Sequence, residues 1–176
     1  MGNVAAALLI LRACDLLTAE HGAKTAATIA LGLYTAYNAA TLASVPAGRL
    51  SDGLGRRGPV LVLAGGVAAF ALSYGLFTID ATTVVFLAIA FVLAGVGTGA
   101  VETAQHSAVA ALAPKDLRGS AFGMLATVQS LGNLAASTVA GLLWTAVSPA
   151  VAFAYLTAWM VIALGGLLLA ARPSGA

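Results

Sequence analysis

Charged residues are scarce in this sequence. Lysine, arginine, aspartate and glutamate make up 8% of its 176 residues, whereas an average soluble domain carries about 25%. A soluble domain of this length needs a charged surface, and 8 basic and 6 acidic side chains cannot cover one. The net charge of only +2 leaves no basic face for nucleic acid. The composition therefore argues against a soluble enzyme and against a nucleic-acid-binding protein.

Cysteine is nearly absent as well. Cys14 is the single cysteine, so no disulfide can form within the chain. Apolar residues dominate instead, because 61% of the residues are hydrophobic and 20 glycines come in addition. This composition predicts a membrane protein. Glycine fits that prediction, since it lets neighbouring membrane helices approach closely.

Long stretches without a charged residue predict the architecture. A membrane-spanning helix needs about 20 apolar residues. The stretches that are long enough cover residues 25–48, 58–79, 81–101 and 119–171. The last stretch holds two helices, because Pro149 disfavours a helical residue before it. Continuous runs of this kind differ from the alternating segments of about 10 residues in outer-membrane barrels.

The sequence therefore predicts an all-α polytopic membrane bundle of about six transmembrane helices, forming one domain over residues 1–176. The first segment is partial, because Arg12 and Asp15 interrupt it. A signal peptide is not predicted, since the positive charge follows the apolar stretch instead of preceding it. The expected segments are about 1–20, 25–48, 59–78, 83–112, 120–146 and 150–171.

Lysine and arginine in the short loops predict the orientation, because cytoplasmic loops are enriched in these residues. Six positive residues fall on one side of a six-helix zigzag, namely Arg49, Arg56, Arg57, Lys115, Arg118 and Arg172. Lys24 lies on the other side, together with Arg12. We therefore expect an integral protein of the plasma (bacterial inner) membrane with its C-terminus in the cytoplasm.

Polar residues at helical spacing predict which helices line a cavity. Residues three or four apart share one face of a helix, and polar groups facing lipid are costly. Such stripes consist of Tyr34, Asn38 and Thr41, of Thr98, Glu102, Gln105 and His106, and of Gln129, Asn133 and Ser137. We expect these helices to turn inward, and segments 59–78 and 150–171 to face lipid. The alternative is that each stripe only bonds one helix to another.

The loop after the second segment holds the sharpest motif of the chain. It reads Gly48-Arg49-Leu50-Ser51-Asp52-Gly53-Leu54-Gly55-Arg56-Arg57-Gly58. Its glycines allow a tight turn with unusual backbone angles, and Asp52 is placed to pair with Arg56 or Arg57, or with a helix N-terminus. The loop closely resembles the G-x-L-x-D-x-x-G-R-R/K signature of the major facilitator superfamily. Gly53 stands where a basic residue is common in that family.

Two further stretches extend the resemblance over essentially the whole chain. Residues 114–123 resemble the P-x-x-x-R-G-x-A-x-G stretch that opens the eleventh helix in many bacterial members. Residues 141–149 resemble the end of that helix and its outer turn. The six segments therefore look like helices seven to twelve, the C-terminal six-helix half of such a transporter. Most of the inner half of helix seven is absent on this mapping, which makes the half truncated.

The resemblance implies a function and a set of functional residues. Members have twelve helices in two halves and move small solutes by alternating access. The conformational-switch loop would consist of Gly48, Asp52, Gly55, Arg56 and Arg57. In it, Asp52 would latch the cytoplasmic side by pairing with a nearby arginine and with a helix N-terminus of the opposite half.

The candidate cavity-lining residues combine the polar stripes with one arginine. They are Arg12, Tyr34, Asn38, Glu102, Gln105, His106, Gln129 and Asn133. Arg12 is included because the first helix of the half lines the cavity in the family, although an interfacial ion pair with Asp15 is the simpler expectation. Glu102 and His106 lie one turn apart, and both a proton relay and a packing hydrogen bond stay open for them.

Other chemistry is not indicated by the sequence. Residues 95–100 contain G-x-G-x-x-A, but that nucleotide-binding pattern needs a strand and a solvated helix start. Its place inside a membrane-length run favours close helix packing or a bend. Further ligands beside Glu102 and His106 are missing, so no metal is predicted. No cofactor and no catalytic triad are indicated, and we do not expect an enzyme.

The sequence thus predicts one half of a secondary transporter. The expected partners are a small-molecule solute of unknown identity, membrane lipid, and either a missing N-terminal six-helix half or a second membrane chain. Two alternatives stay open. One is a non-transporting membrane fragment or regulatory subunit, and the other is a half-size carrier that acts as a dimer. The partial first segment argues against the dimeric carrier.

Overall fold

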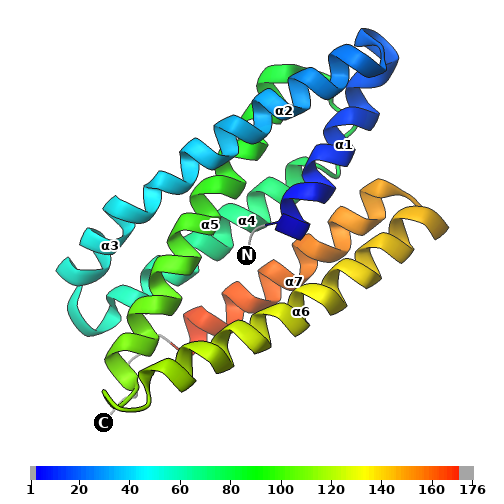
Figure 1. Cartoon of the computed structure of the whole chain (residues 1–176). Coiled ribbons are helices and arrows are strands. Elements are labelled where there is room, and N and C mark those ends of the chain that lie inside the picture. Colours follow the sequence, from blue (N-terminus) through cyan, green and yellow to red (C-terminus); the bar gives the residue numbers. More distant parts are fainter. Residues whose placement is uncertain (1–2, 171–176) are drawn as a thin grey trace.

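The computed structural model describes residues 3–170, and within that range it consists of helices and contains no strand (Figure 1). In chain order, the elements are α1 (Asn3–His21), α2 (Ala23–Ala40), the 3-10 turn η1 (Thr41–Ala43), α3 (Ser44–Gly53), the 3-10 turn η2 (Gly55–Arg57), α4 (Gly58–Leu76), α5 (Val84–Leu112), α6 (Arg118–Ala146) and α7 (Pro149–Ala170). The predicted all-α class is therefore confirmed. Arg172, one of the six predicted cytoplasmic charges, lies outside the described residues.

The second predicted segment is one long, interrupted rod made of α2, η1 and α3. The interruption has a local cause, because Pro46 has no N–H to donate and its ring crowds the carbonyl four residues earlier. The backbone tightens to 3-10 geometry just before it, and Thr41 Oγ1 donates to the Asn38 carbonyl at 2.6 Å. At its other end the rod turns directly into α1 through Gly22, whose φ of 75° favours glycine.

Helix α5 is central, with the α2–η1–α3 rod on one side and α4 on another (Figure 1). Glycines on α5 allow the rod to approach. A Cβ atom on Gly95 would lie 2.3 Å from the Tyr37 carbonyl oxygen, and one on Gly99 would lie 2.5 Å from the Thr41 carbonyl oxygen. The small-xxx-small pair of α5 is therefore a packing surface, as its place inside an apolar run predicts.

Glycine also brings α5 close to α4. A Cβ atom on Gly97 would lie 3.0 Å from the Gly66 carbonyl oxygen, and one on Gly66 would lie 2.8 Å from Val101 Cγ2. Ser73 adds a buried hydrogen bond, since its Oγ donates to the Ala90 carbonyl at 2.8 Å. The two helices consequently pack along most of α4.

The packing of α4 corrects one sequence expectation. We expected segment 59–78 to face lipid, but α4 lies between α5 and α7, and eight of its residues are buried. The row that stays exposed is narrow and includes Leu61, Gly65 and Leu72. The expectation is wrong for most of this helix because its small residues allow contacts on several faces at once. Helix α7 has little buried surface, as expected.

Helix α6 lies at the edge of the bundle and packs mainly against α7 (Figure 1). Ala140 is its one buried residue. The large apolar side chains that it leaves exposed are Met124, Val128, Leu131, Leu134, Val139 and Leu142. Gly119 and Gly123 have open space where a Cβ atom would stand, so this second small-xxx-small pair makes no close helix contact within residues 3–170.

Three helices of the described chain are long and apolar enough to cross a membrane by length and composition. They are α4, α5 and residues Pro149–Leu169 of α7. Helix α6 has 29 residues but includes Gln129 and Asn133, and α1 includes Arg12. Helix α5 is one of the three although it includes Glu102 and Gln105.

Candidate functional site

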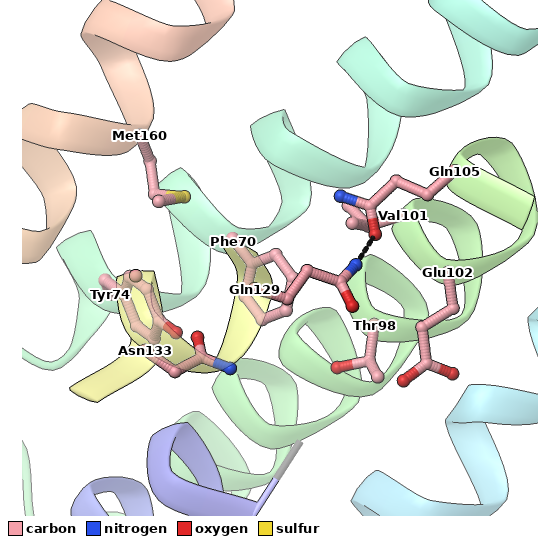
Figure 2. Close-up of a pocket in the computed structure, with 10 residues that line it drawn as sticks. Phe70, Tyr74, Thr98, Val101, Glu102, Gln105, Gln129, Asn133 and Met160 are labelled. Atoms are coloured by element: carbon pink, nitrogen blue, oxygen red, sulfur yellow. Dashed lines mark hydrogen bonds between the residues drawn. The ribbon is translucent and has the colours of Figure 1, made fainter. Parts of the chain in front are cut away.

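A pocket of about 330 Å³ opens among α4, α5, α6 and α7 (Figure 2). Its lining residues are Phe70, Tyr74, Thr98, Val101, Glu102, Gln105, Gln129, Gly132, Asn133 and Met160. Helix α5 provides a polar row at helical spacing, and α6 provides a second row across from it. The pocket volume lies at the lower end of the range of about 300–1,000 Å³ that is usual for small-molecule sites.

The two polar rows meet in one side-chain hydrogen bond. Gln129 Nε2 donates to Gln105 Oε1 (Figure 2). Helices α5 and α6 touch at few other places, so this amide pair is a principal link between them. It closes one side of the pocket and leaves the Asn133 amide on α6 exposed.

A second hydrogen-bonded group supports the pocket from behind. Tyr37 of α2 and Thr98 of α5 share a hydrogen bond of 2.9 Å. Thr98 donates its single hydroxyl proton to the Ala94 carbonyl at 3.0 Å, and therefore it accepts from Tyr37. Tyr37 is buried and orients Thr98 toward the pocket. Glu102 lies one turn further along the same helix.

Two aromatic side chains of α4 also line the pocket. Phe70 and Tyr74 lie one turn apart on α4, with ring centroids 5.6 Å apart and planes tilted by 31°. Met160 of α7 lies on the side of Tyr74, at the end of the pocket away from Glu102 (Figure 2). Sequence reasoning missed these residues because segments 59–78 and 150–171 were assigned to lipid. The spacing of Phe70 and Tyr74 was the signal that could have found them.

The structure brings together four of the eight candidate cavity residues, namely Glu102, Gln105, Gln129 and Asn133. Tyr34 and Asn38 do not line the pocket. Asn38 is exposed and donates to the Tyr34 carbonyl of its own helix at 2.7 Å, while the Tyr34 ring stacks on Tyr37 at 5.7 Å. His106 is exposed and meets the ring of Phe122 edge-on.

Arg12 is the fourth candidate outside the pocket, and its partner differs from the expected one. Its Nη2 atom lies 2.5 Å from Asp80 Oδ1 in the loop between α4 and α5, and not against Asp15. The i, i+3 spacing suggested Asp15, but the Arg12 side chain is buried and reaches the loop between α4 and α5, while Asp15 is exposed. Spacing along one helix could not reveal a partner in a distant loop.

The glycine-rich loop forms the tight turn that its sequence predicts. Gly55 has φ 59°, a conformation that side chains disfavour. A Cβ atom on Gly58 would lie 1.8 Å from the Ser51 carbonyl oxygen, so glycine is required there as well. Gly48 packs less tightly, with Thr103 Cγ2 at 3.6 Å from the position of a Cβ atom.

The described charged side chains of this loop, those of Arg49, Asp52 and Arg57, are exposed. Asp52 and Arg57 are exposed and make no ion pair with each other. The Arg56 side chain lies outside the described part of the chain. The expected pairing of Asp52 with Arg57 is thus absent from the side chains that the structure describes, and the Asp52 carboxylate lies open to solvent.

A helical bundle with membrane-length apolar helices and a polar pocket between them defines a polytopic membrane protein. The sequence profile of the Major Facilitator Superfamily matches residues 3–176, and the chain belongs to this family. The resemblance that the loop motif carries is therefore confirmed, and with it the assignment to a family of membrane transporters.

An individual relative supports the same assignment. An uncharacterised MFS-type transporter of Methanocaldococcus jannaschii is 32% identical over 173 residues. That alignment covers 96% of this chain but 41% of the archaeal protein, so the chain spans less than half the length of this relative. No solved structure matches the chain.

Proposed function

We propose that this chain forms one half of a secondary transporter and moves a small solute by alternating access. The observation that carries the proposal is the pocket in which the polar rows of α5 and α6 meet. Polar side chains in membrane helices are costly and mark solute or ion pathways. Solute sites of such transporters lie near the middle of the membrane, between repeated helical units.

The exposed face of α6 supports the proposal that the chain is one half of a transporter. Its apolar residues and open glycines leave a surface without a protein partner within the described chain. We propose that a second six-helix half covers this face and closes the pocket, either within one longer protein or as a separate chain. A non-transporting subunit would use the same face without moving solute, and a half-size carrier would cover it with a second copy.

We place the protein in the plasma membrane with the glycine-rich loop and the C-terminus in the cytoplasm. The support is the excess of lysine and arginine in the loops on that side. The test introduces Gly53→Cys or Lys24→Cys into a Cys14→Ala background. An impermeant thiol reagent added to intact cells should label position 24 and spare position 53. Gly53 suits this test because it is exposed with open space around it, whereas Ser51 is buried. The reverse labelling pattern would overturn the orientation.

Water access to the pocket tests the transport proposal most directly. Asn133→Cys in the Cys14→Ala background should react with a water-soluble thiol reagent in membranes, because Asn133 lines the pocket. Ile162→Cys is the matched control, since Ile162 is also exposed in the fold but lies on the apolar surface of α7. We expect labelling at position 133 and protection at position 162. Equal protection at both positions would contradict a solute pathway.

Uptake measurements distinguish one half of a transporter from a dimeric half-size carrier and from a non-transporting subunit. Liposomes containing the 176-residue chain should show no saturable uptake from a panel of labelled solutes. Liposomes that contain the chain together with its second half should show uptake of at least one solute. Saturable uptake by the isolated chain would favour the dimeric carrier, and no uptake in either case would favour the non-transporting subunit.

A further inference from the structure

The charge in the pocket has one sign. Glu102 is the only aspartate or glutamate among its lining residues, and none of them is lysine, arginine or histidine. The nearest candidate cations are placed elsewhere, because Arg12 is paired with Asp80 and His106 lies outside the pocket. A solute in this pocket therefore meets a carboxylate and no positive charge from the described chain.

Glu102 has no partner of its own. Among the described side chains it forms no hydrogen bond and no ion pair. Thr98 is one turn away but has already donated its hydroxyl proton to Ala94. An ionised carboxylate in a membrane helix is costly when it is not compensated. A positive group brought in by a solute would supply the missing compensation.

The other end of the pocket favours the apolar or aromatic part of a positively charged solute. Tyr74 and Met160 lie at that end, and the Phe70 ring lines the pocket between them and Glu102 (Figure 2). Aromatic faces attract cations and also pack against aromatic or aliphatic groups. Figure 2 shows Glu102 beside Thr98 at one end of the pocket and Tyr74 and Met160 at the other.

We propose that this pocket selects an amphipathic organic cation. Its cationic group would lie toward Glu102, and its apolar or aromatic part would lie against Phe70 and Tyr74. The amides of Gln129 and Asn133 offer hydrogen bonds to polar groups of either kind, so they orient the solute without choosing its charge. This inference rests on the proposed function, because it names the class of solute that the same site accepts.

Binding of two probes with opposite charge tests the inference. The purified 176-residue chain, in nanodiscs of zwitterionic lipid, is dialysed against labelled phenyltrimethylammonium or benzenesulfonate, and empty nanodiscs are subtracted. Both probes carry one phenyl ring, and they differ in the sign of the charge. We expect the cation to bind at least about tenfold more tightly than the anion. Equal binding, tighter binding of the anion or no binding of either probe would overturn the inference.

Two substitutions locate the bound cation. Glu102→Gln should lower the affinity for phenyltrimethylammonium about tenfold, whereas Glu20→Gln should leave it unchanged. Glu20 is a matched control because it is an exposed carboxylate on α1, outside the pocket. Phe70→Leu should lower the affinity about two- to fivefold through loss of the ring face. Equal affinities of the Glu102→Gln and Glu20→Gln variants would show that the cation binds elsewhere.

The result is separable from the transport proposal. Labelling of Asn133→Cys without preferential cation binding would leave the solute pathway standing and remove the proposed class of solute. Preferential cation binding with protection of Asn133→Cys would support the proposed class of ligand and contradict the solute pathway. Thermal unfolding shows whether Glu102→Gln is misfolded. If it is, the affinity of Phe70→Leu for phenyltrimethylammonium tests the inference instead.

Discussion

The guanidinium group of Arg12 lies 2.5 Å from the Asp80 carboxylate, which is 68 residues away in sequence. The pair is asymmetric, since 7% of the Arg12 side chain is exposed against 80% of the Asp80 side chain. Arg12 Nε is buried and has no hydrogen-bond partner among the described residues. A second contact, Thr82 Oγ1 donating to Glu20 at 2.7 Å, joins the same helix and loop. Together they fasten α1 to the loop between α4 and α5.

We predict that Asp80→Asn destabilises the chain by about 1–3 kcal/mol. This range lies between the values of about 0–1 kcal/mol for exposed pairs and 3–5 kcal/mol for buried pairs that lose one partner. The loss arises because the substitution leaves the Arg12 charge buried and poorly compensated. Thermal unfolding in detergent measures the effect. Asp15→Asn is the control, because it removes an exposed carboxylate of α1 that does not pair with Arg12.

The double variant Arg12→Met with Asp80→Asn should recover most of that stability. Methionine fills the same apolar surroundings without a charge to bury, and such replacements of buried pairs are often neutral or stabilising. A double variant as unstable as Asp80→Asn alone would show that the carboxylate stabilises the loop itself and not the arginine.

The turn between α3 and α4 should depend on two particular glycines. Gly58→Ala places a Cβ atom 1.8 Å from the Ser51 carbonyl oxygen, so the backbone must move. We expect a loss of about 1–3 kcal/mol. Gly55→Ala should cost about 1–2 kcal/mol, because φ is 59° there. Gly53→Ala is the control, since its surroundings are open. Unfolding midpoints that are equal for all three variants would contradict the observed turn.

Glycines on α5 and α6 should respond to alanine in opposite ways. Gly99→Ala should destabilise the chain by about 1–3 kcal/mol, because the Thr41 carbonyl oxygen lies 2.5 Å from the added carbon. Gly123→Ala meets open space in a helix and should be neutral or stabilise by up to about 1 kcal/mol. Comparison of the two unfolding midpoints checks the prediction, and a destabilised Gly123→Ala variant would place a partner against α6 in the isolated chain.

The amide pair of Gln105 and Gln129 should show measurable coupling. A double-mutant cycle with alanine at both positions isolates the hydrogen bond between α5 and α6. Side-chain hydrogen bonds between membrane helices average about 0.6 kcal/mol and reach about 1.7 kcal/mol, and we expect a value in this range. Gln105 with Asn133 serves as the control pair, because no hydrogen bond joins them in the structure. A coupling near zero for both pairs would show that the hydrogen bond between Gln105 and Gln129 adds no stability beyond packing.

Much of the fold could be predicted because its signals are local. Uncharged runs placed the helices, and Pro149 placed the break before α7 within one residue. The G-x-G spacing within α5 predicted close packing, which the contact of Gly99 with Thr41 bears out. The order of neighbours was not predictable in this way. Helix α4 lies between α5 and α7 because small residues occur on several of its faces, and periodicity reports one face at a time.

The candidate site was predicted in part for a similar reason. Polar stripes identified Glu102, Gln129 and Asn133, because each is conspicuous in an apolar run. The aromatic lining was missed, since Phe70 and Tyr74 look like ordinary apolar residues until their position next to α6 and α7 is known. The stripes also include residues that do not line the pocket, because Asn38 bonds to its own helix and His106 packs against Phe122.

The last prediction concerns the open carboxylate of Asp52. Its side chain is exposed at the end of α3, so a partner outside this chain can reach it. We propose that it latches the cytoplasmic side against a helix N-terminus of the second half. Such a contact is worth about 0.3–1 kcal/mol when exposed and up to about 2 kcal/mol when partly buried. This energy shifts a two-state equilibrium by about two- to thirtyfold.

We therefore expect Asp52→Asn, in the assembled transporter, to keep near-normal expression, lower turnover and favour the inward-open form. Asp116→Asn is the matched control, because it removes an exposed carboxylate from the other loop on the same side. In the isolated chain, Asp52→Asn should leave stability unchanged, since the second half is absent. Reactivity of Asn133→Cys from each side of the membrane reports the two forms. If reactivity and uptake are the same in both variants, Asp52 has no latching role and the loop serves only as a positively charged anchor.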